Sequence, residues 1–182
     1  MDIVNFRAAR LEDAPGIAYV HAVSWRATYP GIVPQSHLDS LDEREFAERW
    51  QGWLVGQANT SISIAEANGR ICGFAAGGPI RKPGSSYDGE LYAIYLLPTA
   101  QHQGTGRRLF FRVARELAAR GMHGLLVWVL QQNPATKFYE RLGGERVAEG
   151  VIEVGGACLT EVAYGWSDVA AMYRRSYDEE RE

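Results

Sequence analysis

The sequence predicts a single α/β (α+β) domain in which helices cover both faces of a mixed, mostly antiparallel central sheet. The chain has 182 residues, a length at which one domain can bury a sizeable core. Strand and helix patterns follow the order β-α-α-β-β-β-α-β-α-β-β. One strand-helix-strand crossover lies between antiparallel hairpins, and this makes the predicted sheet mixed.

The first half of the chain supplies one strand, two helices and a hairpin. A strand over 5–10 precedes a helix for which Asp13 is the expected N-cap. A second helix is expected over 41–54, with a stripe of apolar residues. The segment 59–80 alternates polar and apolar residues and turns at Asn68-Gly69, which predicts two antiparallel strands.

The second half supplies four strands and two helices. A strand over 90–98 ends at a proline, and the helix that follows directs four apolar residues inward and ends at Gly121. The apolar run 124–130 reads as a buried strand. A helix over 133–144 has Asn133 as its expected cap, and strands complete the sheet over 145–154 and 157–166. The inward apolar residues of the first of these helices are Leu109, Phe110, Val113 and Leu117.

Composition excludes several classes of function. The net charge of -3 gives no electrostatic footprint for nucleic acid. Cys72 and Cys158 sit in apolar segments as expected buried thiols, and four scattered histidines predict no metal site. With no signal-like start and no long apolar run, we expect a soluble cytoplasmic protein without a membrane partner. We expect residues 1–167 to form the domain and 168–182 a charged tail.

The segment Gln101 to Arg108, "QHQGTGRR", follows a strand and opens a helix. Two arginines in the first helical turn oppose the helix dipole, so a bound anion would offset them. Gly104 and Gly106 let the backbone approach such a ligand, as in phosphate sites. A glycine-rich turn with solvated arginines is the alternative. The lysine of a P-loop is missing, and Leu109 replaces the third glycine of a dinucleotide fingerprint, so ATP and NAD are disfavoured.

Two motifs resemble those of the GNAT superfamily, the acyl-CoA-dependent N-acetyltransferases. The segment "ELYAIYLLPTAQHQGTGRRLF" is similar to their pyrophosphate-binding motif, and "NPATKFYERLGG" to the motif that follows it, about 30 residues later. The resemblance covers nearly the whole chain. It implies a GNAT fold, in which the strands over 90–97 and 124–130 separate to admit the pantetheine arm of acetyl-CoA, the acyl donor.

The resemblance also implies residues that hold acetyl-CoA. The backbone of the glycine segment would bind the pyrophosphate, and the preceding strand would pair with the pantetheine arm. Asn133 and Phe138, from the second motif, would complete the donor site. The cosubstrate residues expected on these grounds are Leu96, Leu97, Gln101, Gln103, Gly104, Thr105, Gly106, Arg107, Arg108, Asn133 and Phe138.

The chemistry requires a proton for the departing thiolate, a place for the oxyanion and a neutral amine. Tyr139 matches the family's tyrosine near the sulfur, and a phenol can donate to a thiolate. Its alternative role is packing on an apolar helix face. Glu90 lies where several relatives have a catalytic glutamate, although a solvated carboxylate at a strand end is equally open. The backbone N-H of Leu96 or Leu97 would receive the oxyanion.

The segment "SWRATYPGIVP" resembles one found in a broad group of these enzymes, and this resemblance implies that the first two helices and the loop between them border the acceptor pocket. Trp25 and Tyr29 are four residues apart and share a helix face, where core packing is the alternative role. Tyr87 and Asp88 could reach the same opening, and an acidic Asp88 beside Glu90 would favour a cationic acceptor.

The expected reaction is transfer of an acetyl group from acetyl-CoA to a primary amine of a small molecule or a protein N-terminus, by direct attack in a ternary complex. A non-catalytic acyl-CoA-binding or sensing module on the same fold is the main alternative. A homodimer could form through the strands after Gly143.

Overall fold

Seven strands form one sheet with the order β1-β2-β3-β4-β5-β7-β6. The computed structural model describes residues 3–56, 59–82 and 85–173. Every neighbouring pair is antiparallel except β4 and β5, which confirms the predicted mixed, mostly antiparallel sheet. The strands are β1 (Val4–Ala8), β2 (Ser61–Ala67), β3 (Arg70–Pro79), β4 (Gly89–Leu96), β5 (Leu125–Leu130), β6 (Glu145–Val154) and β7 (Ala157–Trp166).

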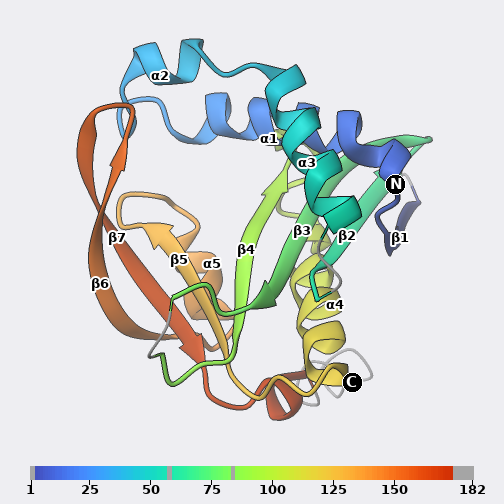
Figure 1. Ribbon diagram of the computed structural model, residues 1–182, viewed down its shortest axis with the longest axis vertical. Helices are drawn as coiled ribbons and strands as arrows, with labels where there is room; N and C mark the ends of the chain where they lie inside the picture. Colours follow the sequence, from blue (N-terminus) through green and yellow to red (C-terminus); the bar gives the residue numbers. More distant parts are fainter. Residues whose placement is uncertain (1–2, 57–58, 83–84, 174–182) are drawn as a thin grey trace.

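Helices cover both faces of the sheet (Figure 1). The first face carries α1 and α3, whose apolar residues pack on Ile64 and Phe74. The second carries α4 and α5, which join a larger cluster built on β3, β4, β5 and β7. The helices are α1 (Ala14–Thr28), α2 (Gln35–Asp39), α3 (Glu43–Gly56), α4 (Thr105–Ala119) and α5 (Thr136–Arg141).

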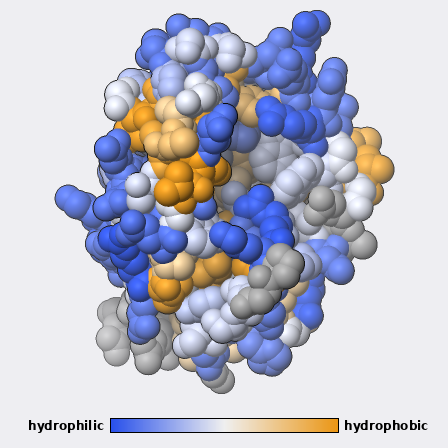
Figure 2. Space-filling model, turned by 60° about the vertical axis from the view of Figure 1, so that its left-hand side comes forward, coloured by the Kyte–Doolittle hydropathy of each residue, from blue (hydrophilic) through white to orange (hydrophobic). Residues whose placement is uncertain are grey.

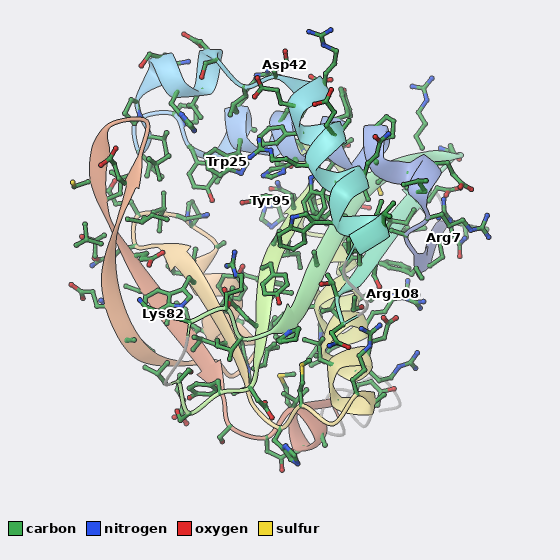
Figure 3. The ribbon with its side chains drawn as sticks, in the orientation of Figure 1. Arg7, Trp25, Asp42, Lys82, Tyr95 and Arg108 are labelled. Carbon is green, nitrogen blue, oxygen red and sulfur yellow. The ribbon has the colours of Figure 1, made fainter. Side chains whose placement is uncertain are left out.

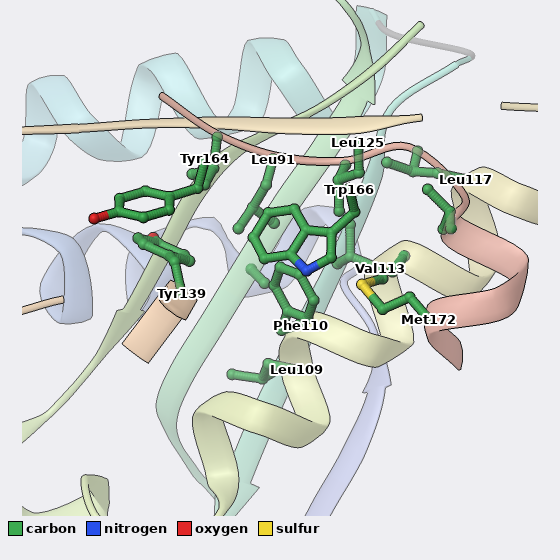
Figure 4. Packing of buried hydrophobic residues seen from close by; sticks show 14 of the residues in the cluster. Leu91, Leu109, Phe110, Val113, Leu117, Leu125, Tyr139, Tyr164, Trp166 and Met172 are labelled. Carbon is green, nitrogen blue, oxygen red and sulfur yellow. The ribbon is translucent and has the colours of Figure 1, made fainter. Parts of the chain in front are cut away.

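The helix α4 presents a strongly apolar side to the sheet. Its four predicted inward residues are fully buried, which confirms the pattern, and Figure 4 shows Phe110 packed between Trp166 of β7 and the rest of α4. A Cβ added at Gly77 on β3 would lie 2.8 Å from a Val113 methyl. The glycine therefore allows α4 to lie close against β3.

The hairpin between β2 and β3 turns where the sequence predicts. Asn68 and Gly69 have φ values of 51° and 73°, the left-handed pair that a two-residue turn of type I′ requires. The last hairpin, β6 and β7, also has the predicted bounds, and Gly155 and Gly156 at its turn have positive φ values. Turn chemistry thus sets the register of both hairpins.

Some local expectations are wrong. Asp13 precedes α1 but makes no cap bond there, because its carboxylate accepts hydrogen bonds from the Arg7 guanidinium at 2.6 and 2.8 Å and from the Arg10 N-H. The short helix α2 was not anticipated. Since α5 begins only at Thr136, Asn133 lies in the turn before that helix.

Two further expectations concern cysteine and the chain end. Cys72 is buried as predicted, but Cys158 is exposed on β7 near the hairpin turn, so the prediction of a buried thiol there was wrong. Residues 169–173 are helical, and Val169 and Met172 pack in the core beside α4 (Figure 4). The first turn of the predicted tail is therefore packed against the domain, whereas residues 174–182 lie outside the described residues.

His21 occupies an aromatic box between α1, α3 and β4. Its ring stacks on Phe46 at 4.2 Å and on Tyr95 at 4.8 Å between ring centroids. Its Nδ1 accepts a hydrogen bond from the Trp50 indole N-H at 3.2 Å. Burial, with a smaller contribution from the Arg49 charge, lowers the pKa of His21 to about 3, so the imidazole is neutral at physiological pH.

This environment predicts acid sensitivity. Because the pKa of His21 is lower in the folded protein than its ordinary 6.5, the unfolded chain binds a proton below pH 6.5 that the fold does not. The free energy of unfolding should fall by about 1.4 kcal/mol per pH unit between pH 6.5 and 4.5 from this group. The carboxyl of Asp13, whose pKa Arg7 lowers, contributes only below its ordinary 3.8. Urea unfolding at several pH values measures the slope. A His21→Phe variant with the same slope would contradict the assignment.

Candidate active site

The strands β4 and β5 pair at only three positions. Gly89, Glu90 and Leu91 oppose Leu125, Leu126 and Val127, and the strands then separate, as Figure 1 shows toward their upper ends. Each strand continues with its other neighbour, since β4 stays paired with β3 to Leu96 and β5 with β7 to Leu130. Beyond Leu91 and Val127 their facing edges are therefore left without strand partners, and the sheet opens as a wedge.

The end of β4 offers one backbone donor to this opening. The N-H of Leu97 donates to the Cys72 carbonyl on β3 at 2.9 Å, so it points into the sheet. The carbonyl of Leu96 faces the opposite edge, where it accepts hydrogen bonds from Ser24 Oγ at 3.0 Å and from Gln101 Nε2 at 3.1 Å. In an extended strand the N-H of a residue points to the same edge as its carbonyl. Of the two expected oxyanion donors, Leu96 therefore has the suitable direction.

The glycine segment begins α4 beside the wedge. Gly104 is the N-cap with a φ of 78°, and no atom lies within 4 Å of the position that its Cβ would take. The first backbone bond of the helix runs from the Arg108 N-H to the Gly104 carbonyl. The N-H groups of Thr105 and Gly106 thus precede the hydrogen-bonded ladder, which is the arrangement that seats an anion.

Gly106 is also the meeting point of three elements. A Cβ at this position would lie 3.5 Å from both Leu96 on β4 and Phe138 on α5. Gln103 stays at the surface, where its side chain donates to the Thr99 carbonyl. Expected cosubstrate residues from both motifs are therefore brought together at the start of α4.

The two arginines of this segment stack on aromatic rings. The Arg107 guanidinium lies 4.8 Å from the centre of the Phe111 ring, and that of Arg108 lies 4.1 Å from the centre of the Phe6 ring on β1. The two arginine side chains therefore lie along the sides of α4, in contact with aromatic rings. An anion at the helix start would be held chiefly by the backbone.

Tyr139 lies on α5, facing the sheet. It is 4% exposed, and its ring lies 6.0 Å from Tyr164 and 6.4 Å from Trp166 (Figure 4). Burial, and to a smaller extent the nearby Tyr29, raises the pKa of Tyr139. The phenol therefore keeps its proton at physiological pH, although the same burial makes it a weaker acid.

Asn133 links the two sides of the wedge. Its Nδ2 donates to the Tyr29 hydroxyl at 3.0 Å, and its Oδ1 accepts from the Ala135 N-H at 2.9 Å. Tyr29 ends α1, whereas Ala135 precedes the helix that carries Tyr139. Asn133 is thus a bridge between halves of the molecule, and these bonds use one of its two Nδ2 hydrogens and one of the two Oδ1 lone pairs.

Aromatic residues from α1 and β4 line the same region. Trp25 contacts Tyr29 at 4.8 Å between ring centroids, which confirms their shared face, and Figure 3 shows Trp25 and Tyr95 side by side. Burial raises the pKa of Tyr95, while the Trp25 indole N-H partly lowers it. That N-H is buried and makes no well-aligned hydrogen bond within the described part of the chain.

Glu90 is 2% exposed, so the alternative of a solvated carboxylate is wrong. Its Oε1 accepts from Arg81 Nε at 3.1 Å and from Nη2 at shorter range, and its Oε2 accepts from the Arg81 backbone N-H at 3.0 Å. Glu90 also belongs to the three paired positions of β4 and β5. An ion pair between the buried Glu90 carboxylate and the exposed Arg81 side chain therefore sits at the apex of the wedge.

Asp88 and Tyr87 do not join the aromatic residues of α1. The Asp88 carboxylate accepts from the N-H groups of His123 and Gly124 at 2.8 to 2.9 Å. Although burial opposes it, these bonds lower the pKa of Asp88. Tyr87 lies over Gly124 and Gly165, where added Cβ atoms would clash with its ring. Asp88 therefore keeps its negative charge beside the start of β5, apart from the aromatic residues of α1, and its role toward a cationic acceptor remains a prediction.

Two general features complete the description. Across residues 3–56, 59–82 and 85–173, no helix is long and apolar enough to cross a membrane. In the same ranges, no group of three or more His, Cys, Asp and Glu side chains could hold a metal ion.

Comparison with known proteins identifies the class. Residues 75–151 match the family described as FR47-like protein. The chain is 43% identical over 171 residues to the uncharacterized N-acetyltransferase YuaI of Bacillus subtilis, covering 93% of this chain and 96% of that protein. It is 27% identical to the L-amino acid N-acyltransferase MnaT of Escherichia coli, covering 84% and 85%.

Among solved structures, the PaiA N-acetyltransferase of Thermoplasma acidophilum in complex with coenzyme A superposes with a TM-score of 0.69, at 20% identity and with 90% and 99% coverage. The wedge, the glycine start of α4 and these likenesses define an acyl-CoA-dependent N-acetyltransferase. The chain belongs to the GNAT superfamily. The expected family, fold and acetyl-CoA cosubstrate are thereby confirmed, whereas the roles of single residues remain predictions.

The bridge through Asn133 predicts a stability coupling. Tyr29→Phe leaves a buried amide N-H without its acceptor and should reduce the free energy of unfolding by about 1 to 3 kcal/mol. Asn133→Ala removes the same bond together with the turn bond to Ala135 and should cost at least as much. In the Asn133→Ala background, Tyr29→Phe should then cost much less. Urea unfolding of the four proteins tests this, and strictly additive losses would contradict the bridge.

Proposed function

We propose that this protein transfers the acetyl group of acetyl-CoA to a primary amine of a small molecule or a protein N-terminus, by direct attack of the amine in a ternary complex. The observation that carries the proposal is the separation of β4 and β5 beyond three pairs, directly beside the glycine start of α4. Tyr139 lies on α5 next to Phe138, whose ring and the Leu96 side chain of β4 both lie 3.5 Å from the position that a Cβ on Gly106 would take.

In this proposal the donor lies on the α4 and α5 side of the wedge. The backbone of residues 103–108 receives the pyrophosphate, and the edge of β4 that faces the wedge at Leu96, with Leu97 directly after it, borders the pantetheine arm. Phe138 packs against this end of β4 near Gly106. Asn133 acts by holding α5 against Tyr29 more than by direct contact, since its amide is already bonded on both sides.

The acceptor nitrogen attacks the thioester carbonyl carbon, a C-N bond forms, and the C-S bond breaks. The Leu96 N-H stabilises the negative charge on the carbonyl oxygen, and Tyr139 donates its proton to the departing sulfur. The attacking amine loses a proton to Glu90, directly or through water. Because Arg81 already donates to both oxygens of Glu90, a water-mediated route fits the geometry better.

The acceptor enters from the opposite side, where α1 and α3 cover the sheet. Trp25, Tyr29 and Tyr95 form the aromatic wall of this side. Tyr87 remains a predicted acceptor residue, although its contacts with Gly124 and Gly165 place it beside the paired ends of the strands. Relatives are named for different acceptors, such as L-amino acids and spermidine, so the class of amine must come from this chain's own residues.

The proposal also includes an oligomeric contact and a location in the cell. Hydrophobic side chains gather on the side formed by β6 and β7 (Figure 2), and on the edge strand β6 the exposed ones are Val147, Val151 and Ile152. We assign a homodimer contact to this edge.

The enzyme would act in the cytoplasm, where acetyl-CoA is available to it.

Ligand binding should raise the melting temperature selectively. At about 100 times its dissociation constant, acetyl-CoA should add about 2.7 kcal/mol to the free energy of unfolding, or on the order of 5 to 10 °C for a chain of this length. CoA should act similarly, and ATP and NAD at equal concentration should not. A melt that responds to ATP or NAD and not to any CoA species would exclude the proposed donor site.

Tyr139→Phe separates an enzyme from a binding module. The substitution removes the phenolic proton but keeps the buried ring, so the stabilisation by acetyl-CoA should persist. The turnover number should fall by about 100- to 10,000-fold if Tyr139 is the acid. Thiol release measured with a thiol-reactive dye, alongside the melt, provides both readouts. Unchanged turnover would return Tyr139 to a packing role, and an absence of turnover in the native protein would favour a sensing module.

A further inference from the structure

Two consecutive basic residues of the β3–β4 loop lie on the two aromatic residues that flank the apex of the wedge. Tyr92 on β4 and Trp128 on β5 are the first residues after the last pair, Leu91 with Val127. The Arg81 guanidinium lies 4.7 Å from the centre of the Tyr92 ring, and Lys82 Nζ lies 4.9 Å from the centre of the Trp128 ring. Each side of the opening thus begins with an aromatic ring under a cation.

The two cations differ in how many of their hydrogen-bond donors are already used within the protein. Arg81 is fixed by its hydrogen bonds to the buried Glu90. Lys82 makes no ion pair within 4.0 Å in the described part of the chain, and its side chain is exposed over β5 and β7 (Figure 3). Its ammonium therefore keeps donors for a further partner.

A carboxylate near Lys82 balances the charge of the Lys82 ammonium without forming an ion pair with it in the described part of the chain. Glu161 on β7 lies near enough for Lys82 to lower its pKa, against the larger opposing effect of burial. Gly150 on β6 leaves room for this pair, because an added Cβ would lie 3.3 Å from Glu161 Oε1 and 3.4 Å from the Trp128 ring. Arg81 with Glu90 and Lys82 with Glu161 give four charges that sum to zero, a setting that suits a zwitterion better than a polycation.

We propose that Lys82 binds a carboxylate of the acceptor, and that the substrates of this enzyme are amino acids whose amine and carboxylate lie within a few bonds of each other. The proposal rests on the proposed function, since it assigns the acceptor of that reaction. The amine points into the wedge and the carboxylate points out to Lys82. Trp128 and Tyr92 border the side chain of the acceptor, together with Trp53 of α3, whose ring lies 5.3 Å from that of Tyr92.

This assignment distinguishes between the classes of acceptor that are all compatible with the acetyl-transfer reaction. A protein N-terminus has an amine but no carboxylate beside it, so it would leave Lys82 without its partner. A polyamine has no carboxylate either, so it would likewise leave Lys82 without its proposed partner.

The test compares acceptors that differ only in the carboxylate. L-phenylalanine and L-methionine are each compared with the corresponding amide, at saturating acetyl-CoA. The native enzyme should acetylate each amino acid with a kcat/KM about 10- to 100-fold above that of its amide. The α-amine of an amino acid amide is less basic than that of the free amino acid, so a larger fraction of it is in the neutral, reactive form. An enzyme that does not bind the carboxylate would therefore acetylate the amides faster than the amino acids.

The matched variants are Lys82→Met and Arg70→Met. Each removes one exposed positive charge, and Arg70 lies at the distant β2–β3 turn. Lys82→Met should reduce kcat/KM for the amino acids by about 10- to 100-fold, leave the amides unchanged, and leave the KM for acetyl-CoA unchanged. Arg70→Met should behave as the native protein does.

The outcomes distinguish this inference from the proposed function. If amides or carboxylate-free amines are acetylated as well as the amino acids, or if Lys82→Met affects both members of a pair equally, the inference is overturned and the proposed function stands. If the protein acetylates no amine of either kind, both are overturned.

Discussion

The site depends on a competition between strand partners. A sheet is most stable when every backbone group is paired, yet β4 and β5 share only three positions. Each strand is held along its full length by an antiparallel neighbour, β4 by β3 and β5 by β7. These two hairpin-like halves diverge, and the wedge between them is the consequence. Everything assigned to the active site borders this wedge.

A wedge with so few connecting pairs needs other contacts to fix its width. Ser24 of α1 donates to the Leu96 carbonyl, which anchors the end of β4 to the first helical layer. The Tyr29 hydroxyl accepts from Asn133, which ties the end of α1 to the turn before α5. Because α5 carries Tyr139, the same bond helps to hold the proposed acid in place relative to α1. The two proposed substrates therefore meet in a space whose dimensions are set by a few polar contacts.

Sequence patterns predicted the features that depend on local geometry. The Asn68-Gly69 turn, the apolar side of α4 and the bounds of β6 and β7 follow from short-range signals. Features that depend on the choice of partner by a polar side chain could not be predicted. The Asp13 carboxylate binds Arg7, six residues earlier, and makes no cap bond to α1, and the Asp88 carboxylate binds the backbone N-H of His123, 35 residues later. The three-pair limit of β4 and β5 depends on contacts that are equally far apart in the sequence.

The donor and acceptor sides of the wedge also differ in how the sequence encodes them. The donor side is formed by backbone N-H groups at a glycine turn, an arrangement that a short motif can specify. On the acceptor side, side chains from α1, α3, β4, β5, β7 and the β3–β4 loop converge. A single substitution in that loop changes the charge presented to the acceptor without altering the strands that hold the donor. Lys82 is exposed and outside the hydrogen-bonded framework, so it is the position at which acceptor preference can change with little cost in stability.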